Sequence, residues 1–176
     1  MTAKEKSALT RLAEEVLQEA RAAGLKIATA ESCTGGLVAA ALTSIAGSSD
    51  VFDRGFVTYS NEAKEEMLGV SAILLQDRGA VSREVAIAMA EGALSHSPAQ
   101  LSVAVTGIAG PGGGSAEKPV GLVHFAAARK MSIKTPEAGI ATIHEEKRFA
   151  EIGREAVRTQ SVDLALRLLL RATSLK

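Results

Sequence analysis

The spacing of hydrophobic positions changes several times along the chain, from every third or fourth residue to short continuous apolar runs. The first spacing is typical of amphipathic helices, and short apolar runs are typical of buried strands. The pattern predicts helices over 5–23, 37–45, 61–68, 82–94 and 149–172. It predicts strands over 25–30, 51–60, 101–106, 120–128 and 137–146. Such alternation of helices and strands indicates an α/β fold.

Small and polar residues mark the ends of these elements. Gly24 is a natural C-terminal cap for the first helix, and Ser82 opens the helix over 82–94. Gly55 predicts a bulge within the strand over 51–60. The last two strands are separated by a short connection, which favours a hairpin.

We therefore expect a three-layer α/β/α architecture, in which helices cover both faces of an open mixed β-sheet. The strand over 101–106 is nearly all apolar, as expected where both faces of a sheet are covered. We find no internal repeat and no linker, so we expect residues 1–176 to form a single domain.

Composition excludes several classes of protein. Hydrophobic residues make up 47% of the 176 residues, and 20 basic residues balance 20 acidic ones. This neutral balance argues against a general nucleic-acid binder. No apolar run approaches the ~20 residues of a membrane span, and we recognise no targeting segment. The single cysteine excludes an intramolecular disulfide. We expect a cytoplasmic protein that binds neither nucleic acid nor membrane.

The stretch "ATAESCTGGLVAAAL", residues 28–42, has the pattern of a strand, a tight turn and a helix. N–H groups at such a turn attract a phosphate or a developing oxyanion, which makes Ser32 a candidate nucleophile. The alternative is that Ser32 or Thr34 only caps the helix. Cys33 is a rival nucleophile, and its alternative is a half-buried structural thiol.

A serine nucleophile needs a base. The three histidines, His96, His124 and His144, show neither a carboxylate partner nor metal-ligand spacing, so we expect structural roles for them. Lysine is the other option.

The stretch "TYSNEAKEE" offers such a lysine. Ser60 or Asn61 would cap the following helix, which places Lys64 in its first turn. The helix dipole disfavours a cation there and lowers the lysine pKa, so a neutral amine could act as base. Tyr59, the only tyrosine, could relay a proton. The alternative is a solvated lysine beside a packed tyrosine.

A second candidate is the glycine-rich stretch "TGIAGPGGGSAEKPVG", residues 106–121, directly after a buried strand. It fits neither a P-loop nor a dinucleotide-binding fingerprint, and a strand follows it. It is either a ligand-binding loop at a strand end or a flexible surface loop. We expect the loops after the strands that end near residues 30, 59 and 106 to meet at one rim.

The last helix is expected to carry three arginines, Arg148, Arg154 and Arg158. Arg154 and Arg158 are four residues apart and therefore share a face. They could receive a substrate phosphate. The alternative is a solvated charged face.

Five motifs resemble those of the CinA C-terminal domain family, in the family's order: "AESCTGGL", "YSNEAK", "GAVS", "AVTGIAGPGGG" and "KPVG". Together they cover most of residues 6–172. The resemblance implies hydrolysis of the carboxamide of nicotinamide mononucleotide to nicotinate mononucleotide and ammonia, without metal or cofactor. It also implies a small-molecule nucleotide substrate and a homo-oligomer, either a dimer or a trimer.

Carried across motif by motif, the resemblance makes Ser32 the nucleophile, Lys64 its base and Tyr59 an assisting hydroxyl. The residues implied in holding the oxyanion or the nucleotide are Glu31, Thr34, Gly35, Gly36, Thr106, Gly107, Ala109, Gly110 and Arg154. One departure concerns the last helix, which begins with a Gly-Asp-Arg type motif in the family and with Ile152-Gly153-Arg154 here.

Two other functions stay open at this point. The same pocket could bind a nucleotide without turnover, as a module linked to competence or the DNA damage response. It could also belong to an amidase of different substrate, because a fold does not fix its chemistry.

Overall fold

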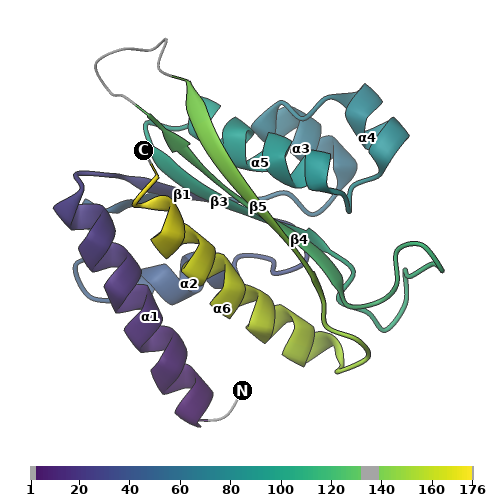
Figure 1. Ribbon diagram of the computed structural model, residues 1–176, viewed down its shortest axis with the longest axis horizontal. Helices are drawn as coiled ribbons and strands as arrows, with labels where there is room; N and C mark the ends of the chain where they lie inside the picture. Colours follow the sequence, from purple (N-terminus) through teal and green to yellow (C-terminus); the bar gives the residue numbers. More distant parts are fainter. Residues whose placement is uncertain (1–2, 132–138, 176) are drawn as a thin grey trace.

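The computed structural model describes residues 3–131 and 139–175. Its centre is a five-stranded sheet in the order β2-β1-β3-β4-β5 (Figure 1). The strands are β1 (Ile27–Glu31), β2 (Phe52–Val57), β3 (Leu101–Gly107), β4 (Leu122–Lys130) and β5 (Ile140–Arg148). β1 pairs in parallel with β2 and β3, whereas β3–β4 and β4–β5 are antiparallel. The predicted open mixed sheet and the β4–β5 hairpin pairing are confirmed.

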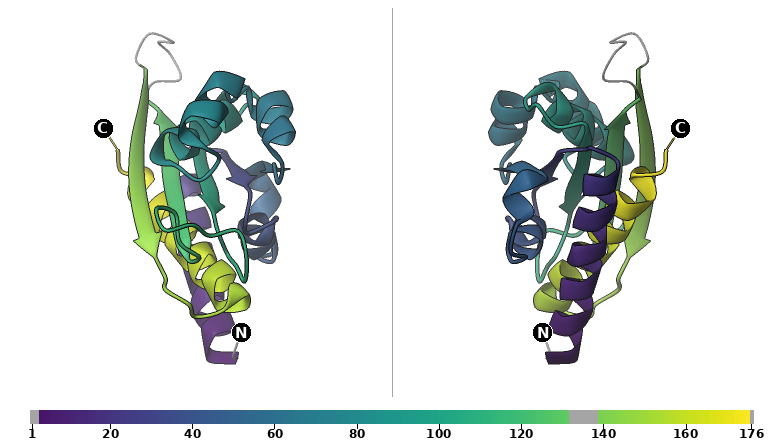
Figure 2. Two further views of the ribbon diagram at one scale, coloured as in Figure 1. Left: turned by 90° about the vertical axis from the view of Figure 1, so that its right-hand side faces the viewer. Right: turned by 90° about the vertical axis from the view of Figure 1, so that its left-hand side faces the viewer.

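Helices cover both faces of this sheet. They are α1 (Ala3–Ala22), α2 (Leu37–Thr43), α3 (Asn61–Leu68), α4 (Ala72–Arg78), α5 (Arg83–Ser95), α6 (Arg154–Ala172) and a short 3-10 helix (Ser48–Asp50). Figures 1 and 2 show α1 and α6 running side by side, with α3, α4 and α5 gathered away from them. None of the described helices is both long and apolar enough to cross a membrane.

The two faces of the sheet carry side chains of different size because successive residues of a strand point to opposite sides. Val103 and Val105 of β3 join the buried residues of α1, α2 and α6. Ala104, between them, packs with the buried residues of α5. Alanines recur on the α5 side of β1 and β4 as well, namely Ala28, Ala30, Ala126 and Ala128. The predicted three-layer α/β/α arrangement is therefore confirmed.

Two helices differ from the prediction, one in its existence and one in its first residue. The segment Ala72–Arg78 forms α4, which we did not predict, although Ser71 caps it by accepting a hydrogen bond from the N–H of Leu74. The final helix begins at Arg154 rather than near residue 149. Phe149 is instead buried in the core, and Ala150 and Gly153 have positive φ, which a helix does not allow.

β2 does have an irregularity in its pairing, but the extra residue is Asp53 and not Gly55 as predicted. The pairing of β1 with β2 shifts between Ile27, opposite Phe52, and Ala28, opposite Arg54. Gly55 has a packing role, because a Cβ there would lie 2.9 Å from Thr29 Oγ1 and 3.2 Å from Ala39 Cβ.

The topology brings the three candidate loops together. β1, β2 and β3 are adjacent and parallel, so their carboxyl ends lie at one edge of the sheet. The loops that follow Glu31, Val57 and Gly107 therefore start from neighbouring points, as predicted. In doubly wound sheets this edge is where ligands bind.

The contact between α3 and α5 generates the first testable prediction. A Cβ added to Gly92 of α5 would lie 2.2 Å from the carbonyl oxygen of Leu68. We expect Gly92→Ala to lower the free energy of unfolding by about 1–3 kcal/mol through overpacking, although alanine ordinarily favours helices. Urea titration measures this. Gly112→Ala is the control, since its Cβ would meet nothing within 4 Å. Equal stability of the two variants would contradict the account.

Candidate active site

Ser32 lies directly after β1, in the turn that leads to α2. Its N–H donates to the carbonyl of Val105 at 2.9 Å, which anchors the serine to the neighbouring strand β3. Gly35 and Gly36 both have positive φ, +60° and +98°, and so allow the sharp reversal into α2. The side chain of Ser32 is 9% exposed, so it lies at the edge of the buried interior.

Lys64 approaches Ser32 from α3. Ser60, rather than Asn61, caps this helix, and its side chain accepts a hydrogen bond from the N–H of Ala63. Lys64 follows in the first turn, as predicted, and its side chain is only 1% exposed. Its Nζ lies 3.2 Å from Ser32 Oγ, within hydrogen-bond reach. The alternative of a solvated lysine is wrong.

The other neighbours of Lys64 Nζ are backbone carbonyls. Nζ donates to the oxygen of Thr58 at 2.8 Å and to that of Ser60 at 3.3 Å. None of the ion pairs among the described residues involves Lys64. Burial lowers the pKa of Lys64, so the main cause is loss of water around the amine rather than the helix dipole that we expected.

This arrangement suits a neutral amine. Two N–H groups can donate to the two carbonyls, which leaves the nitrogen lone pair for the hydroxyl proton of Ser32. Enzymes use lysines whose pKa is lowered by burial as general bases, and serine–lysine pairs are known variants of the serine triad. The Ser32–Lys64 pair can therefore act as a nucleophile with its base.

Cys33 is adjacent to the pair but has the properties of a structural thiol. Its side chain is 5% exposed, and burial raises the pKa of the thiol to about 12. Since the thiolate is the nucleophilic form of cysteine, the thiol is unreactive at neutral pH. The geometry favours Ser32 over Cys33.

Glu31 has a backbone role that the sequence did not reveal. Its carboxylate accepts hydrogen bonds from the N–H groups of Gly36, Val38 and Ala39 at 2.8–3.0 Å, and it is 1% exposed. The carboxylate thus takes the place of an N-cap for α2. Its substrate contact stays a prediction that this geometry does not favour.

Some N–H groups of the turn are therefore bonded within the protein, and others are available to a ligand. Gly36 donates to Glu31, and Gly35 donates to the carbonyl of Ser32 at 3.0 Å, so neither is available as we had expected. Within the described residues, the N–H groups of Cys33 and Thr34 have no backbone acceptor. The buried Thr34 hydroxyl also has no partner there. The donors left for a ligand therefore come from residues 33 and 34.

Tyr59 and Arg154 meet at the rim of the site. Arg154 donates to the Tyr59 hydroxyl and to the carbonyl of Gly110, each at 3.0 Å. Tyr59 is 61% exposed, so it is not a packed core residue. Arg154 therefore joins the loop after β2 to the glycine-rich loop. Arg148 does not lie on α6; it ends β5 and pairs with Glu146 at 3.0 Å.

The glycine-rich loop is fixed at its base. Thr106 donates from Oγ1 to the carbonyl of Ala80 at 2.8 Å, and Lys118 donates to the carbonyl of Arg78. A Cβ on Gly107 would lie 2.6 Å from Val123 Cγ2, so only glycine fits against β4 there. Ala109 is buried. These contacts argue against the flexible-loop alternative for the parts of the loop nearest the sheet.

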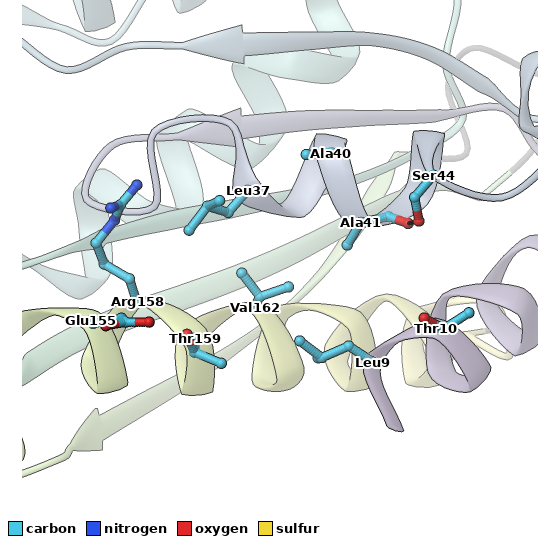
Figure 3. Close-up of a pocket in the computed structure, with 10 residues that line it drawn as sticks. All are labelled: Leu9, Thr10, Leu37, Ala40, Ala41, Ser44, Glu155, Arg158, Thr159 and Val162. Carbon is cyan, nitrogen blue, oxygen red and sulfur yellow. Dashed lines mark hydrogen bonds between the residues drawn. The ribbon is translucent and has the colours of Figure 1, made fainter. Parts of the chain in front are cut away.

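Arg158, the second arginine of the α6 face, does not point to solvent. Its Nε donates to the carbonyl of Cys33 at 3.1 Å and its second terminal nitrogen to that of Thr34 at 2.9 Å. The aliphatic stem lines a cavity of about 630 Å³ between α1, α2 and α6, together with Leu37 and Val162 (Figure 3). This cavity includes neither Ser32 nor Lys64.

Sequence comparison gives the family. A model described as the CinA C-terminal domain matches residues 9–173. The chain belongs to this family. The resemblance inferred from the five motifs is thereby confirmed. A CinA-family neighbour of known structure, the competence/damage inducible protein CihA from Agrobacterium tumefaciens, is 51% identical, with a TM-score of 0.87 over 95% of this chain and 96% of that one.

Relatives within the CinA family have two lengths. The nicotinamide-nucleotide amidohydrolase PncC of Escherichia coli (strain K12) is 48% identical over 163 residues, which are 93% of each chain. A CinA-like protein of Syntrophobacter fumaroxidans is 49% identical over 160 residues, 91% of this chain but 35% of that protein. The chain thus spans about a third of the length of the CinA-like relatives that it matches.

None of the hydrogen bonds among the described residues joins a histidine to Ser32 or Lys64, but two of the three histidines form a pair. His124 Nδ1 lies 3.0 Å from His144 Nε2, and the rings are stacked with centroids 5.3 Å apart. Burial lowers the pKa of both imidazoles. His96 ends α5, where its Nδ1 lies 2.9 Å from the carbonyl of Gly92.

The pair predicts a pH dependence of stability. Both folded-state pKa values lie below the ordinary value of 6.5, so the unfolded chain binds protons first as the pH falls. Stability present above pH 6.5 should therefore decrease as the pH falls through the lowered pKa values. We expect the double variant His124→Gln/His144→Gln to lose less stability than the wild type between pH 7.5 and 5.5, measured by urea unfolding. An equal loss in both would contradict this.

Proposed function

We propose that this protein hydrolyses the carboxamide of nicotinamide mononucleotide to nicotinate mononucleotide and ammonia. The observation that carries the proposal is the buried Lys64 Nζ, 3.2 Å from Ser32 Oγ and otherwise surrounded by carbonyls. The substrate is suggested by the printed name of the E. coli relative, which matches this chain over nearly its whole length.

The reaction begins with proton transfer. The Ser32 hydroxyl gives its proton to neutral Lys64, and Ser32 Oγ attacks the carboxamide carbon. The tetrahedral intermediate collapses as the C–N bond breaks, and protonated Lys64 gives its proton to the leaving ammonia. A water molecule then attacks the acyl-serine ester while Lys64 again accepts a proton. Cleavage of the ester returns the proton to Ser32 and releases the carboxylate.

The remaining site residues would stabilise the negative charges of the oxyanion and of the substrate phosphate. The oxyanion is assigned to the N–H groups of Cys33 and Thr34, because the other N–H groups of the turn already have acceptors. Each such donor is typically worth ~3–4 kcal/mol in the transition state. Arg154, exposed between Tyr59 and Gly110, is the proposed phosphate contact, and the Tyr59 hydroxyl that it holds would assist proton transfer.

The proposal extends to the whole chain. We propose that it acts as one amidase domain and forms a homo-oligomer, a dimer or a trimer. Size-exclusion chromatography with light scattering measures the assembly directly.

The dyad is tested by ammonia release from nicotinamide mononucleotide. We expect Ser32→Ala and Lys64→Met each to lower kcat by about 10³-fold or more, because nucleophile and base act as one unit. Lys26→Met is the matched control, since Lys26 precedes β1 at the opposite end of the sheet and is exposed.

Three outcomes distinguish the candidate functions. Wild-type turnover in either dyad variant would contradict the mechanism. Thermal stabilisation of the wild type by the nucleotide without ammonia release would favour a binding module. Release of ammonia from other amides but not from this nucleotide would favour a different amidase.

A further inference from the structure

The turn after Ser32 is held by two charged side chains of opposite sign. The Glu31 carboxylate accepts hydrogen bonds from the N–H of Gly36, at the end of the turn, and from those of Val38 and Ala39 in α2. Arg158 binds two successive carbonyls within it, those of Cys33 and Thr34. Neither side chain belongs to an ion pair among the described residues. Both are used to orient backbone peptide groups.

The carbonyl bonds have a consequence for the N–H groups. In a trans peptide the C=O and N–H bonds point in opposite directions across one rigid plane. The carbonyl of Cys33 points to Arg158 on α6, so the N–H of Thr34, which belongs to the same peptide group, points away from α6. That N–H has no backbone acceptor among the described residues. Arg158 thus fixes the direction of an available donor two residues after the nucleophile.

The turn requires such a restraint. Gly35 and Gly36 both adopt positive φ, and glycines reach several backbone conformations at little cost. The Gly35 N–H bond to the Ser32 carbonyl closes a four-residue turn around the peptide plane between Cys33 and Thr34, but the central plane of such a turn can still flip between turn types. Rotation would remove the Thr34 N–H from the position in which it can meet a developing negative charge. A charged donor on the carbonyl also polarises the peptide group and strengthens its N–H as a donor.

We propose that Arg158 is a positioning residue, which orients the Thr34 N–H toward the oxyanion by holding the carbonyls of Cys33 and Thr34. This inference rests on the proposed amide hydrolysis. It replaces the sequence-based expectation that Arg158 binds the substrate phosphate, because its guanidinium is half-buried against the two carbonyls of the turn, whereas Arg154 is exposed at the rim. Figure 3 shows the side chain rising from α6 beside Leu37 toward this turn.

Steady-state kinetics of Arg158→Gln and Arg158→Lys separate positioning from substrate binding. We expect Arg158→Gln to lower kcat about 100-fold, the effect of a slightly misplaced catalytic group, with KM within threefold of the wild type. Arg158→Lys, which keeps the charge but has one nitrogen in place of the planar fork, should recover part of kcat. Arg167→Gln, on the exposed face of α6 and paired with Asp163, is the control and should leave both constants unchanged.

Hydrogen–deuterium exchange of the same proteins gives a readout independent of activity. We expect faster exchange of the amides in residues 32–39 in Arg158→Gln, and wild-type exchange there in Arg167→Gln. If Arg158→Gln does not fold, the kinetics and the exchange of Arg158→Lys are compared with those of the wild type instead. We then expect a smaller loss of kcat and a smaller gain in exchange.

Two results would overturn the inference. One is wild-type kcat in Arg158→Gln, with or without a raised KM; a raised KM alone would identify a phosphate contact. The other is unchanged exchange over residues 32–39. A wild-type protein that releases no ammonia would instead refute the proposed function, and the exchange comparison would still decide whether Arg158 holds the turn.

Discussion

Lys64 is a long basic side chain that the fold buries with backbone carbonyls and one serine hydroxyl around its nitrogen. Transfer of an ammonium group from water into such a site is costly unless a negative charge compensates it. None of the ion pairs among the described residues involves Lys64, so burial shifts its amine toward the neutral form. The burial of Lys64 therefore costs stability, but it also places a neutral base beside Ser32. Such perturbed ionisable groups are typical of active sites.

The sheet makes this contact between distant residues. β1 and β2 are parallel neighbours, and the N–H of Thr58 extends the pairing by donating to the carbonyl of Glu31 at 2.9 Å. The chain after β2 is thereby held beside the chain that carries Ser32. The Ser60 cap then fixes where α3 begins, and so which residue of its first turn faces Ser32. Strand pairing places the chain after β2 beside Ser32, and the helix cap then sets the position of Lys64. Together they bring the base to the nucleophile.

Much of the fold could be predicted because its signals are local. Hydrophobic spacing located the elements, and Ser60 and Ser82 marked two helix starts that the structure confirms. The start of α6 was missed because Phe149 continues the apolar pattern of the helix, although it directly follows β5 and precedes Ala150 and Gly153, which have positive φ. Helix α4 has both a serine cap and a following glycine, and those signals could have identified it.

The candidate site was predicted less completely. Ser32 and Lys64 could be proposed from strand ends and helix starts, whereas Glu31 and Arg158 bind the backbone of a turn that only the folded chain creates. A carboxylate beside a glycine-rich turn was the available signal for Glu31, because helix N–H groups attract anions. No local signal separates Arg158 from Arg154, since both lie on one face of α6 and only the tertiary contacts distinguish them.

The most direct test of this account is the pKa of the Lys64 amine, followed by NMR of isotopically labelled lysine side chains across a pH titration, with Lys64→Met used for assignment. The account predicts one lysine that loses its proton below the ordinary value near 10.5 and whose signal is absent in the variant. Titration of Lys64 together with the other lysines near 10.5 would contradict its role as the neutral base of Ser32.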